Sequence, residues 1–425
     1  MKIQQKKIVI LSLLSILFLR YEGMAQGKKL ALEEIRSQAL EHNKKLKKAQ
    51  KEVEAAKAAL LSARAGGKPT LDGSVMGIYL SGPLNTLLPE LQASAVLSAT
   101  QVIYAGAKVQ NSQKLAASAV ELQIAQQSLT EDEVLLKAES AYWNLVSIKE
   151  KSVLAQKYLD LLGTLHKSLK NSFDAGLIYK NDLLKVEVKR NEAELNLTRA
   201  QDGLTMAKLN LAQIAGLTEL SFDVQDTVVV QYGLVAQADR SLMENRPEIV
   251  MLNKAVEIQS LQTKILQGDQ KPTVALNAYG VSAFGKHINV KNQSNTMPVA
   301  VGVLSVNVPL LDWGQRKQKV KEQRFKADAQ RLELEETRDL VGLEIQNAWF
   351  QLSQAAKRIS LSEKSLLQTE ENLRLNQDRL DAGTVLGEDV LEAQVLWQQA
   401  YSDLIDAKAE YKVNEAKYKK AVGDY

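Results

Sequence analysis

The residues best suited to chemistry in this chain are carboxylates that follow two glycine turns. Asp389 and Glu392 come shortly after Asp381-Ala382-Gly383, and Asp182 has the matching place after Asp174-Ala175-Gly176. Residues three apart share one face of a helix, so Asp389 and Glu392 would present two negative charges side by side. The simplest interpretation of Asp389 is an acidic side chain at a helix start, where the helix dipole favours it.

Other residues able to do chemistry are too few or too scattered to predict a catalytic or metal site. The chain has no cysteine, which excludes a disulfide framework, a thiolate metal site and a cysteine nucleophile. Its three histidines, His42, His166 and His287, show no metal-binding spacing such as His-x-x-Glu-His. The sequence therefore predicts no enzyme, no metal and no cofactor.

The amino terminus has the pattern of a secretory signal peptide. Three lysines precede an apolar run at 8–19, and Gly23-Met24-Ala25 offers a small-x-small cleavage site. Residues 1–25 contain four positive charges and one negative, so their removal changes the net charge from +4 to +1. A chain so nearly neutral lacks the strongly basic surface of a nucleic-acid binder. No run of about 18 apolar residues occurs after the signal peptide, so the sequence predicts no transmembrane helix.

The rest of the chain is a duplication with a spacing of 207 residues (381 minus 174). The two glycine turns are one landmark, and the aromatic clusters at 141–145 and 348–352 are another. Lys68-Pro69-Thr70 returns as Lys271-Pro272-Thr273, and all three landmarks keep their order. The repeat is too long for a solenoid or a propeller. We therefore expect a first structural repeat at 26–217, a linker at 218–237 and a second repeat at 238–425.

The residue pattern of each repeat predicts a helix, two strands, a long helix and a shorter returning helix. All seven prolines lie outside 90–246 and 310–425, which suits very long helices because an interior proline costs about 3 kcal/mol. The expected ranges are 30–65, 70–80, 93–103, 107–170 and 181–214 in the first copy, and 238–267, 273–283, 299–308, 315–378 and 388–421 in the second. The segments 81–92 and 284–298 are expected to be loops between the strands.

The lengths and composition of these elements predict a cylinder of helices built from several copies rather than a globule. Leu71, Val75 and Tyr79 alternate with Asp72 and Ser74 in a strand of about 10 residues, the length of a tilted membrane-crossing strand. The helices are rich in Ala, Gln and Asn, so one chain buries little apolar surface and we expect coiled-coil packing between copies. We expect the aromatic clusters to pack between helices.

Several short motifs occur at equivalent places in the two copies. The segment Phe173-Asp174-Ala175-Gly176-Leu177-Ile178 precedes Asp182-Leu183-Leu184, and Leu380-Asp381-Ala382-Gly383-Thr384 precedes Asp389-Val390-Leu391. The strand-to-helix junction is Pro309-Leu310-Leu311-Asp312-Trp313-Gly314. With these motifs the chain resembles the TolC family of outer-membrane efflux channels over nearly all of its mature length. The resemblance implies a homotrimer that is mainly α, with a trimeric 12-stranded membrane β-barrel, four strands from each protomer, and a periplasmic α-helical barrel.

The resemblance also implies a function and a location. The protein would be a passive duct in the outer membrane, extending into the periplasm. It would serve a tripartite efflux or type I secretion system and carry small molecules or polypeptides to the exterior. Its partners would be outer-membrane lipid, a periplasmic adaptor (a membrane fusion protein) and an inner-membrane transporter.

The resemblance further assigns roles to residues at the two turns. Acidic residues after the second turn ring the periplasmic aperture in the family; they match Asp389 and Glu392, with Asp182 in the first copy. Some members lock the aperture with an aromatic residue and an arginine, where this chain has Leu380 and Val385, so its lock differs. The tip that docks the adaptor matches the two turns, which comprise Asp174, Ala175, Gly176, Leu177, Asp381, Ala382, Gly383 and Thr384.

Two other protein classes compete with a channel. A periplasmic coiled-coil adaptor of an export complex also has long helical hairpins, but it needs one hairpin flanked by small β domains. A structural coiled-coil protein of such a complex has no need for two pairs of alternating strands.

Overall fold

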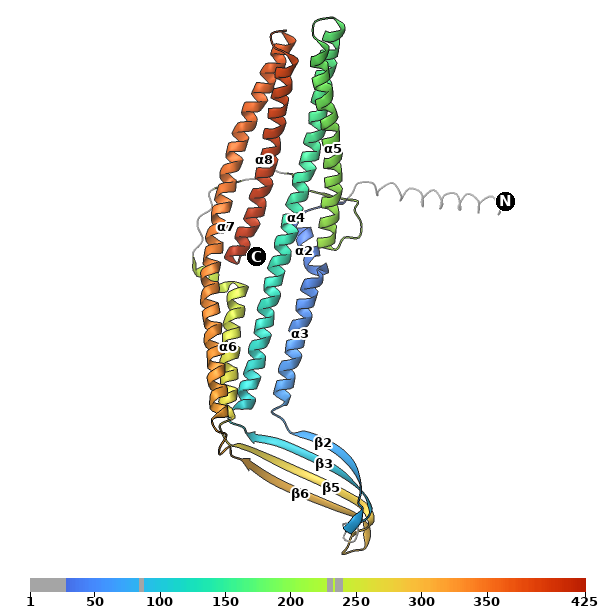
Figure 1. Ribbon diagram of the computed structural model, residues 1–425, viewed down its shortest axis with the longest axis vertical. Coiled ribbons are helices and arrows are strands. Elements are labelled where there is room, and N and C mark those ends of the chain that lie inside the picture. The colour runs from blue at the N-terminus through green and yellow to red at the C-terminus, as the bar shows by residue number, and fades with distance from the viewer. Residues whose placement is uncertain (1–27, 84–87, 228–231, 234–239) are drawn as a thin grey trace, which may run out of the picture. The chain divides into compact units, whose positions relative to one another are not determined.

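The computed structural model describes residues 28–83, 88–227, 232–233 and 240–425 (Figure 1). The predicted signal peptide at 1–25 and part of the predicted linker at 218–237 lie outside these residues. The chain forms two compact units. One, here called the hairpin unit, contains Glu131–Leu242, Gly342–Tyr425 and the chain up to Lys47. The other, here called the sheet unit, contains Lys48–Thr130 and Met243–Val341.

The sheet unit contains a four-stranded antiparallel sheet in the order β2-β3-β5-β6. The strands are β2 (Thr70–Tyr79), β3 (Leu91–Tyr104), β5 (Thr273–Asn289) and β6 (Ser294–Asn307). Asp72 is opposite Ser98, and Val75 is opposite Ala95. Opposed residues of an antiparallel pair share a face, so the alternation expected in the first strand pair is present.

The second strand pair is longer than the sequence predicts. β5 continues to Asn289 and β6 begins at Ser294, so most of the expected loop at 284–298 is strand. The ladder shifts register after Phe284 and resumes where Asn289 pairs with Ser294. The prediction failed because Gly, Ser and Asn in this segment indicated a loop, whereas pairing with a neighbouring strand overrides weak residue preferences.

Four helices complete the sheet unit. They are α3 (Lys44–Ala65), α6 (Pro247–Gly268) and the first parts of α4 (Lys108–Asp174) and α7 (Gln315–Asp381). Pro247 opens α6, as expected for a residue with no N–H to donate. The helix expected from 238 therefore begins later, after a 3₁₀ turn at Arg240–Asn245. Lys254 of α6 forms an ion pair with Glu121 of α4 at 2.5 Å. The side-chain amide of Gln323 on α7 donates a hydrogen bond to Gln259 on α6.

The junctions between sheet and long helix repeat the same bend with different residues. Gly106 and Ala107 have φ values of 62° and 65°, and Trp313 and Gly314 have values of 53° and 86°. At Gly106 an added Cβ would lie 2.7 Å from the carbonyl oxygen of Gly268, so only glycine fits there. At Trp313, the second copy tolerates a side chain in the left-handed region, at some conformational cost.

The hairpin unit consists mainly of two helical hairpins of equal dimensions. α4 is followed by α5 (Lys180–Ala215), and α7 by α8 (Gly387–Val422). The long helices have 67 residues each and the returning helices 36 each. Both pairs begin 207 residues apart, from 108 to 315 and from 180 to 387, so the duplication inferred from sequence is present in the fold.

The first helix of the chain is interrupted, contrary to the single helix expected at 30–65. α2 (Leu32–His42) ends at Asn43, whose backbone is extended with ψ 122°. The Asn43 side chain accepts hydrogen bonds from the N–H groups of Lys45 and Leu46 and so starts α3 as an N-cap. A short parallel pair of strands, β1 (Lys28–Leu30) and β4 (Phe222–Val224), lies outside every sequence prediction.

The core of the hairpin unit includes the first aromatic cluster. Tyr142 and Trp143 are buried, as the sequence predicts. Phe350, the counterpart of Trp143, is exposed, so the prediction is wrong for that residue within one chain. None of the helices in the described part of the chain is long and apolar enough to cross a membrane.

Candidate functional site

Both predicted turns close their hairpins with the same backbone geometry. Gly176 has φ 73° and Gly383 has φ 69°, in the left-handed region where glycine is favoured. After Gly176, the N–H of Leu177 donates to the carbonyl oxygen of Ser172 at 2.9 Å. After Gly383, the N–H of Thr384 donates to the carbonyl oxygen of Arg379, also at 2.9 Å. This pattern ends a helix while satisfying its last carbonyl groups.

The turn residues are exposed. In the first hairpin the exposed residues are Asp174, Ala175, Gly176 and Leu177. In the second hairpin all four residues at 381–384 are exposed. Beyond the first turn, Tyr179 is also exposed, and Leu386 is exposed beyond the second. The two turns therefore leave backbone and apolar groups exposed.

The predicted aperture acids lie at the starts of the returning helices. The carboxylate of Asp389 accepts the N–H of Leu386 at 2.8 Å and so caps the start of α8. The interpretation of Asp389 as a helix-start carboxylate is thus correct, yet its side chain remains exposed to solvent. Glu392 is exposed one turn later on the same helix, and Asp182 is half-buried at the equivalent place on α5.

The structure brings the two helix starts together through residues that sequence reasoning missed. Lys185 of α5 forms an ion pair with Glu388 of α8 at 2.5 Å, and this hydrogen bond raises the pKa of Lys185. Leu169 of α4 packs so closely on Gly387 that an added Cβ there would lie 2.7 Å from it. One signal was available in the sequence: Lys185 stands where the second copy has Glu392, a reversal of charge at an equivalent position.

The two positions that the resemblance matches to an aromatic residue and an arginine are partly buried. Leu380 is half-buried and packs on the core of the hairpin unit, and Val385 is also half-buried. The Lys185–Glu388 ion pair is the polar contact that joins the hairpins beside these positions.

A buried polar cluster lies elsewhere in the hairpin unit. Arg36 of α2 forms an ion pair with the buried Glu139 of α4 at 2.9 Å, and its guanidinium lies 5.5 Å from the ring centre of Tyr425. Burial raises the pKa of Glu139 despite the nearby Arg36. The cluster ties three segments of the hairpin unit together. Within the described residues, no three His, Asp or Glu side chains gather as metal ligands.

Comparisons with known proteins agree with this geometry. The model of the family "Outer membrane efflux protein" matches residues 35–217 and 240–424. Outer membrane efflux protein BepC of Brucella suis biovar 1 (strain 1330) is 21% identical over 310 residues, which are 72% of this chain. The matched region spans 64% of the length of BepC.

Solved structures share the fold. The Campylobacter jejuni CmeC outer membrane channel superposes with a TM-score of 0.82 at 16% identity, covering 92% of this chain and 85% of that one. The outer membrane protein VceC from Vibrio cholerae gives 0.80 at 17% identity, covering 92% and 96%. The open state of the Neisseria gonorrhoeae MtrE channel gives 0.80 at 18% identity, covering 92% and 88%.

These matches agree with the sequence-based expectations at the level of family. Family and fold are those of channel proteins rather than of known enzymes. The mainly helical fold with a sheet portion, and the location in the outer membrane, are confirmed. Because the family match takes in both repeats, this protein belongs to the outer membrane efflux protein family.

Proposed function

We propose that this protein is the outer-membrane duct of a tripartite efflux or type I secretion system. Three copies form a twelve-stranded barrel in the membrane and a helical tunnel in the periplasm. Small molecules or polypeptides pass through it from an inner-membrane transporter to the exterior. The observation that supports this most directly is a sheet with one apolar face and two unpaired edges, in a chain that also has two long helical hairpins.

One face of the sheet is apolar, whereas on the other face polar side chains stand among apolar ones such as Val301 and Val303. On one face are large apolar side chains exposed to solvent in a single chain, among them Leu71, Leu304 and Val75, which is 81% exposed. On the other face, Thr100 donates a hydrogen bond to Asn277, and Asn277 donates to Ser305. A transmembrane barrel turns its apolar face to lipid and its polar face to a water-filled lumen.

The edges of the sheet point to closure by further copies. Within the described residues, the outer sides of β2 and β6 have no strand partner. Lipid does not tolerate unpaired backbone groups, so β6 of one copy must pair with β2 of the next. The chain already contains this pairing once, because β3 of the first repeat pairs with β5 of the second. Three copies give the twelve strands that the family resemblance implies.

The turns and helix starts then have separate tasks. The turns at 174–177 and 381–384 form the periplasmic tip that docks the adaptor. Asp389 and Glu392, with Asp182 nearby, surround the aperture inside the tip, and three copies bring six carboxylates from α8 to one axis. Such a ring attracts cations and repels anions. The duct is passive, and the driving energy comes from the transporter.

The alternative is a periplasmic coiled-coil adaptor or a structural protein of an export complex. It shares the hairpins with a channel and would explain the helices equally well. It gives no role to the exposed apolar face of the sheet. Leaving that face in water costs a free energy of about 25 cal/mol for each Å² of apolar surface.

Matched lysine substitutions on the two faces of β2 test the proposal. Val75→Lys places a charge on the lipid side, where it costs about 2–4 kcal/mol near the middle of the membrane. Ser74→Lys places the same charge on the lumen side. We expect Val75→Lys to abolish recovery of a trimer from the outer membrane and Ser74→Lys to leave it intact. A wild-type protein found as a monomer in the periplasm, or giving no conductance in planar bilayers, would refute the duct.

A further inference from the structure

A pocket of about 270 Å³ lies in the sheet unit, where the sheet meets the helices. It is bordered by the end of α6, the start of β5, the end of β6 and the starts of α4 and α7. Its charged lining residues are one acid and four cations: Asp269, Lys108, Lys271, Arg316 and Lys319. The volume is far above what a single water molecule needs, so a small polyatomic ion fits inside.

Two of the four cations are held in place by neighbouring groups. Lys108 pairs with Asp269 at 2.8 Å, and its stem packs so closely on Gly268 that an added Cβ there would lie 2.5 Å from the Lys108 Cγ. The guanidinium of Arg316 lies 3.4 Å from the carboxylate of Asp312, which also accepts the Arg316 backbone N–H at the start of α7. These contacts fix two positive groups in the wall of the pocket.

The other two cations, Lys271 and Lys319, form no ion pair in the part of the chain that the structure describes, and both are exposed. Glu322, one turn along α7 from Lys319, pairs with Lys326 instead, at 2.7 Å. Four cations set against the two acids that pair with them leave a formal charge of +2 at the pocket of each copy. The pocket is therefore electrically suited to an anion.

The fold itself does not require this positive charge. Helix α7 has three cations among its first five residues, Arg316, Lys317 and Lys319, and no acid in its first turn. The helix dipole disfavours cations at that end of a helix. The equivalent residues of the first repeat, 207 positions earlier, are uncharged: Val109, Gln110 and Ser112. A charge that the helix disfavours and the duplicate lacks is expected where a ligand needs it.

The pocket adjoins the more polar face of the sheet. Thr273 and Asn307 line it and lie opposite each other in the ladder between β5 and β6. Alternate residues of a strand share a face, so these two lie on the face of Asn277 and Ser305, whose side chains are hydrogen-bonded. The proposed barrel turns this face to its lumen and the opposite face, with the exposed Val306, to lipid. The pocket thus lies on the side of the lumen.

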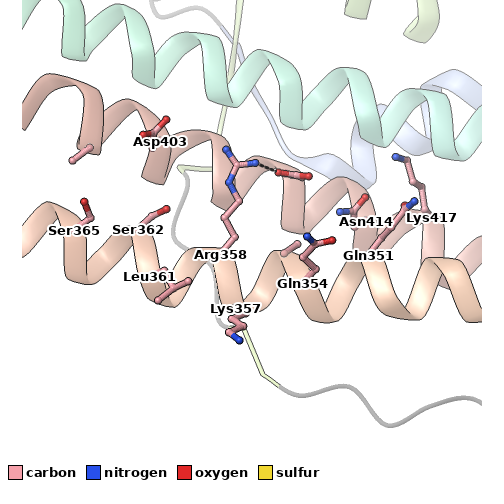
Figure 2. A pocket seen from close by; sticks show the side chains of 13 residues that line it. Gln351, Gln354, Lys357, Arg358, Leu361, Ser362, Ser365, Asp403, Asn414 and Lys417 are labelled. Atoms are coloured by element: carbon pink, nitrogen blue, oxygen red, sulfur yellow. Dashed lines mark hydrogen bonds and ion pairs between the residues drawn. The ribbon is translucent and has the colours of Figure 1, made fainter. Parts of the chain in front are cut away.

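The groove between α7 and α8 in the hairpin unit has a different charge pattern (Figure 2). Its volume is about 800 Å³, and its cations Lys357, Arg358 and Lys417 lie among the acids Asp403 and Glu410. An ion pair between Arg358 and Glu410 crosses the groove. Cations that are neutralised in this way attract an anion weakly, so uncompensated charge distinguishes the pocket in the sheet unit.

We propose that the basic pocket of the sheet unit binds the phosphate group of solutes that pass through the lumen. This inference rests on the proposed duct and names a chemical class of solute that its barrel holds. Lysine and arginine donate charge-assisted hydrogen bonds to phosphate oxygens, and Thr273 and Asn307 add uncharged polar groups. Three copies place three such pockets around the lumen, and rings of basic side chains select anions and phosphate in pores.

The pocket and the proposed aperture acids act on ions of opposite sign. Asp389 and Glu392 belong to the hairpin unit, whereas the pocket belongs to the sheet unit. A multivalent cation should therefore block the duct when it is added on the side of the tip. A phosphate compound should block it when added on the side of the barrel, because from the other side it must first pass the carboxylates.

Titration calorimetry with inorganic pyrophosphate tests the site directly. The full mature protein in mild detergent is compared with Lys271→Gln/Lys319→Gln, which removes the two unpaired cations. We expect the wild type to bind pyrophosphate and the double variant to bind it at least about tenfold more weakly. The matched control, Lys68→Gln with Lys317→Gln, removes two exposed lysines of the same unit that do not line the pocket, and it should bind as the wild type does. If the double variant does not fold, Lys319→Gln alone replaces it in the comparison.

Current recordings in planar bilayers of a neutral lipid test the position of the site. Pyrophosphate added on the side of the barrel should reduce the single-channel current of the wild type and of the control variant. It should leave the current of Lys271→Gln/Lys319→Gln unchanged. Raising the salt concentration should weaken the block, because dissolved ions screen the charges of the pocket.

The outcomes separate this inference from the proposed function. A conducting trimer that does not bind pyrophosphate, or binds it equally in the wild type and in Lys271→Gln/Lys319→Gln, overturns the site while the duct stands. Anionic lipid that copurifies with the wild type but not with the double variant, without block by pyrophosphate, assigns the pocket to a lipid headgroup and overturns the lumen site. A protein that binds pyrophosphate but does not conduct overturns the proposed duct and leaves the phosphate site in place.

Discussion

The ammonium group of Lys185 lies 2.5 Å from a carboxylate oxygen of Glu388 and joins the two hairpins just past their turns. Both side chains are substantially exposed, and exposed ion pairs contribute little to folding. The pair links α5 to α8, and beside it Leu169 of α4 packs on Gly387 of α8. Its position beside the proposed aperture acids suits it to hold the aperture narrow.

We therefore predict that Lys185→Ala raises single-channel conductance without loss of the folded trimer. The exchange Lys185→Glu with Glu388→Lys should return conductance towards the wild-type value, because the pair reforms with reversed charge. Lys189→Ala is the matched control, since Lys189 pairs with Glu192 on the same helix and links nothing across hairpins. Equal conductance in Lys185→Ala and Lys189→Ala would show that the ion pair does not restrict the pore.

The carboxylates of α8 are predicted to set ion selectivity. Asp389→Asn with Glu392→Gln removes six charges from a trimer, while the new amide oxygen at position 389 can still accept the N–H that Asp389 accepts at the helix start. We expect the reversal potential in a salt gradient to move towards zero, with weaker block by multivalent cations. Glu370→Gln, an exposed change on α7, should alter neither. An unchanged reversal potential in the double variant would place the aperture elsewhere.

The two turn glycines are predicted to be required for export. Gly176→Val and Gly383→Val each force a β-branched residue into the left-handed region, at a cost of roughly 1–2 kcal/mol. Nothing lies within 4 Å of an added Cβ at either site, so the effect is conformational rather than a clash. We expect the double variant to insert into the membrane but to lose adaptor binding and export. Gly163→Val, inside α4 and equally uncrowded, should export normally; export by the turn variant would disprove the role of the tip.

The hydroxyl of Tyr142 is predicted to stabilise the hairpin unit. It donates to Asp226 at 2.7 Å, and burial together with this bond raises the pKa of Tyr142. Tyr142→Phe should lower stability by about 2 kcal/mol, because the bond is to a charged acceptor.

This contribution also has a definite pH dependence. A raised folded pKa means that the stabilisation is complete below the unfolded value, about 10, and is lost as the pH rises through the folded value. Thermal unfolding at pH 7 and at pH 11 measures it, with the exposed Tyr179→Phe as control. If the difference in stability between wild type and Tyr142→Phe stays constant from pH 7 to pH 11, the Tyr142 hydroxyl does not make this pH-dependent contribution.

The features predicted best from sequence were those fixed by local pattern and by duplication. The glycine turns, the proline-free hairpins and the strands near 70 and 273 each depend on residues close in sequence. The break at Asn43 was missed because the flanking residues all favour helix, whereas the cap depends on a single side chain. The β1–β4 pair was missed because it joins segments almost 200 residues apart with only three residues each.

In the candidate site, too, residues set by local pattern were predicted and residues set by packing were missed. Asp389 was singled out because it repeats the position of Asp182 after a recognisable turn, and Glu392 because it shares a helix face with Asp389. Lys185 and Glu388 were missed because their contact depends on how two hairpins pack, and helix-surface charges are usually solvated. The proposed division at 217/218 and 237/238, the aperture roles and the docking tip remain predictions.

The equal lengths of the two hairpins restrict how this protein can evolve. A deletion of seven residues from each arm of one hairpin would withdraw its turn by about 10 Å while the other stayed in place. Lys185 and Glu388 could then no longer meet. Changes in length should therefore arise as coordinated events in four helices, so that descendants of this duplication differ by matched heptads rather than by isolated insertions.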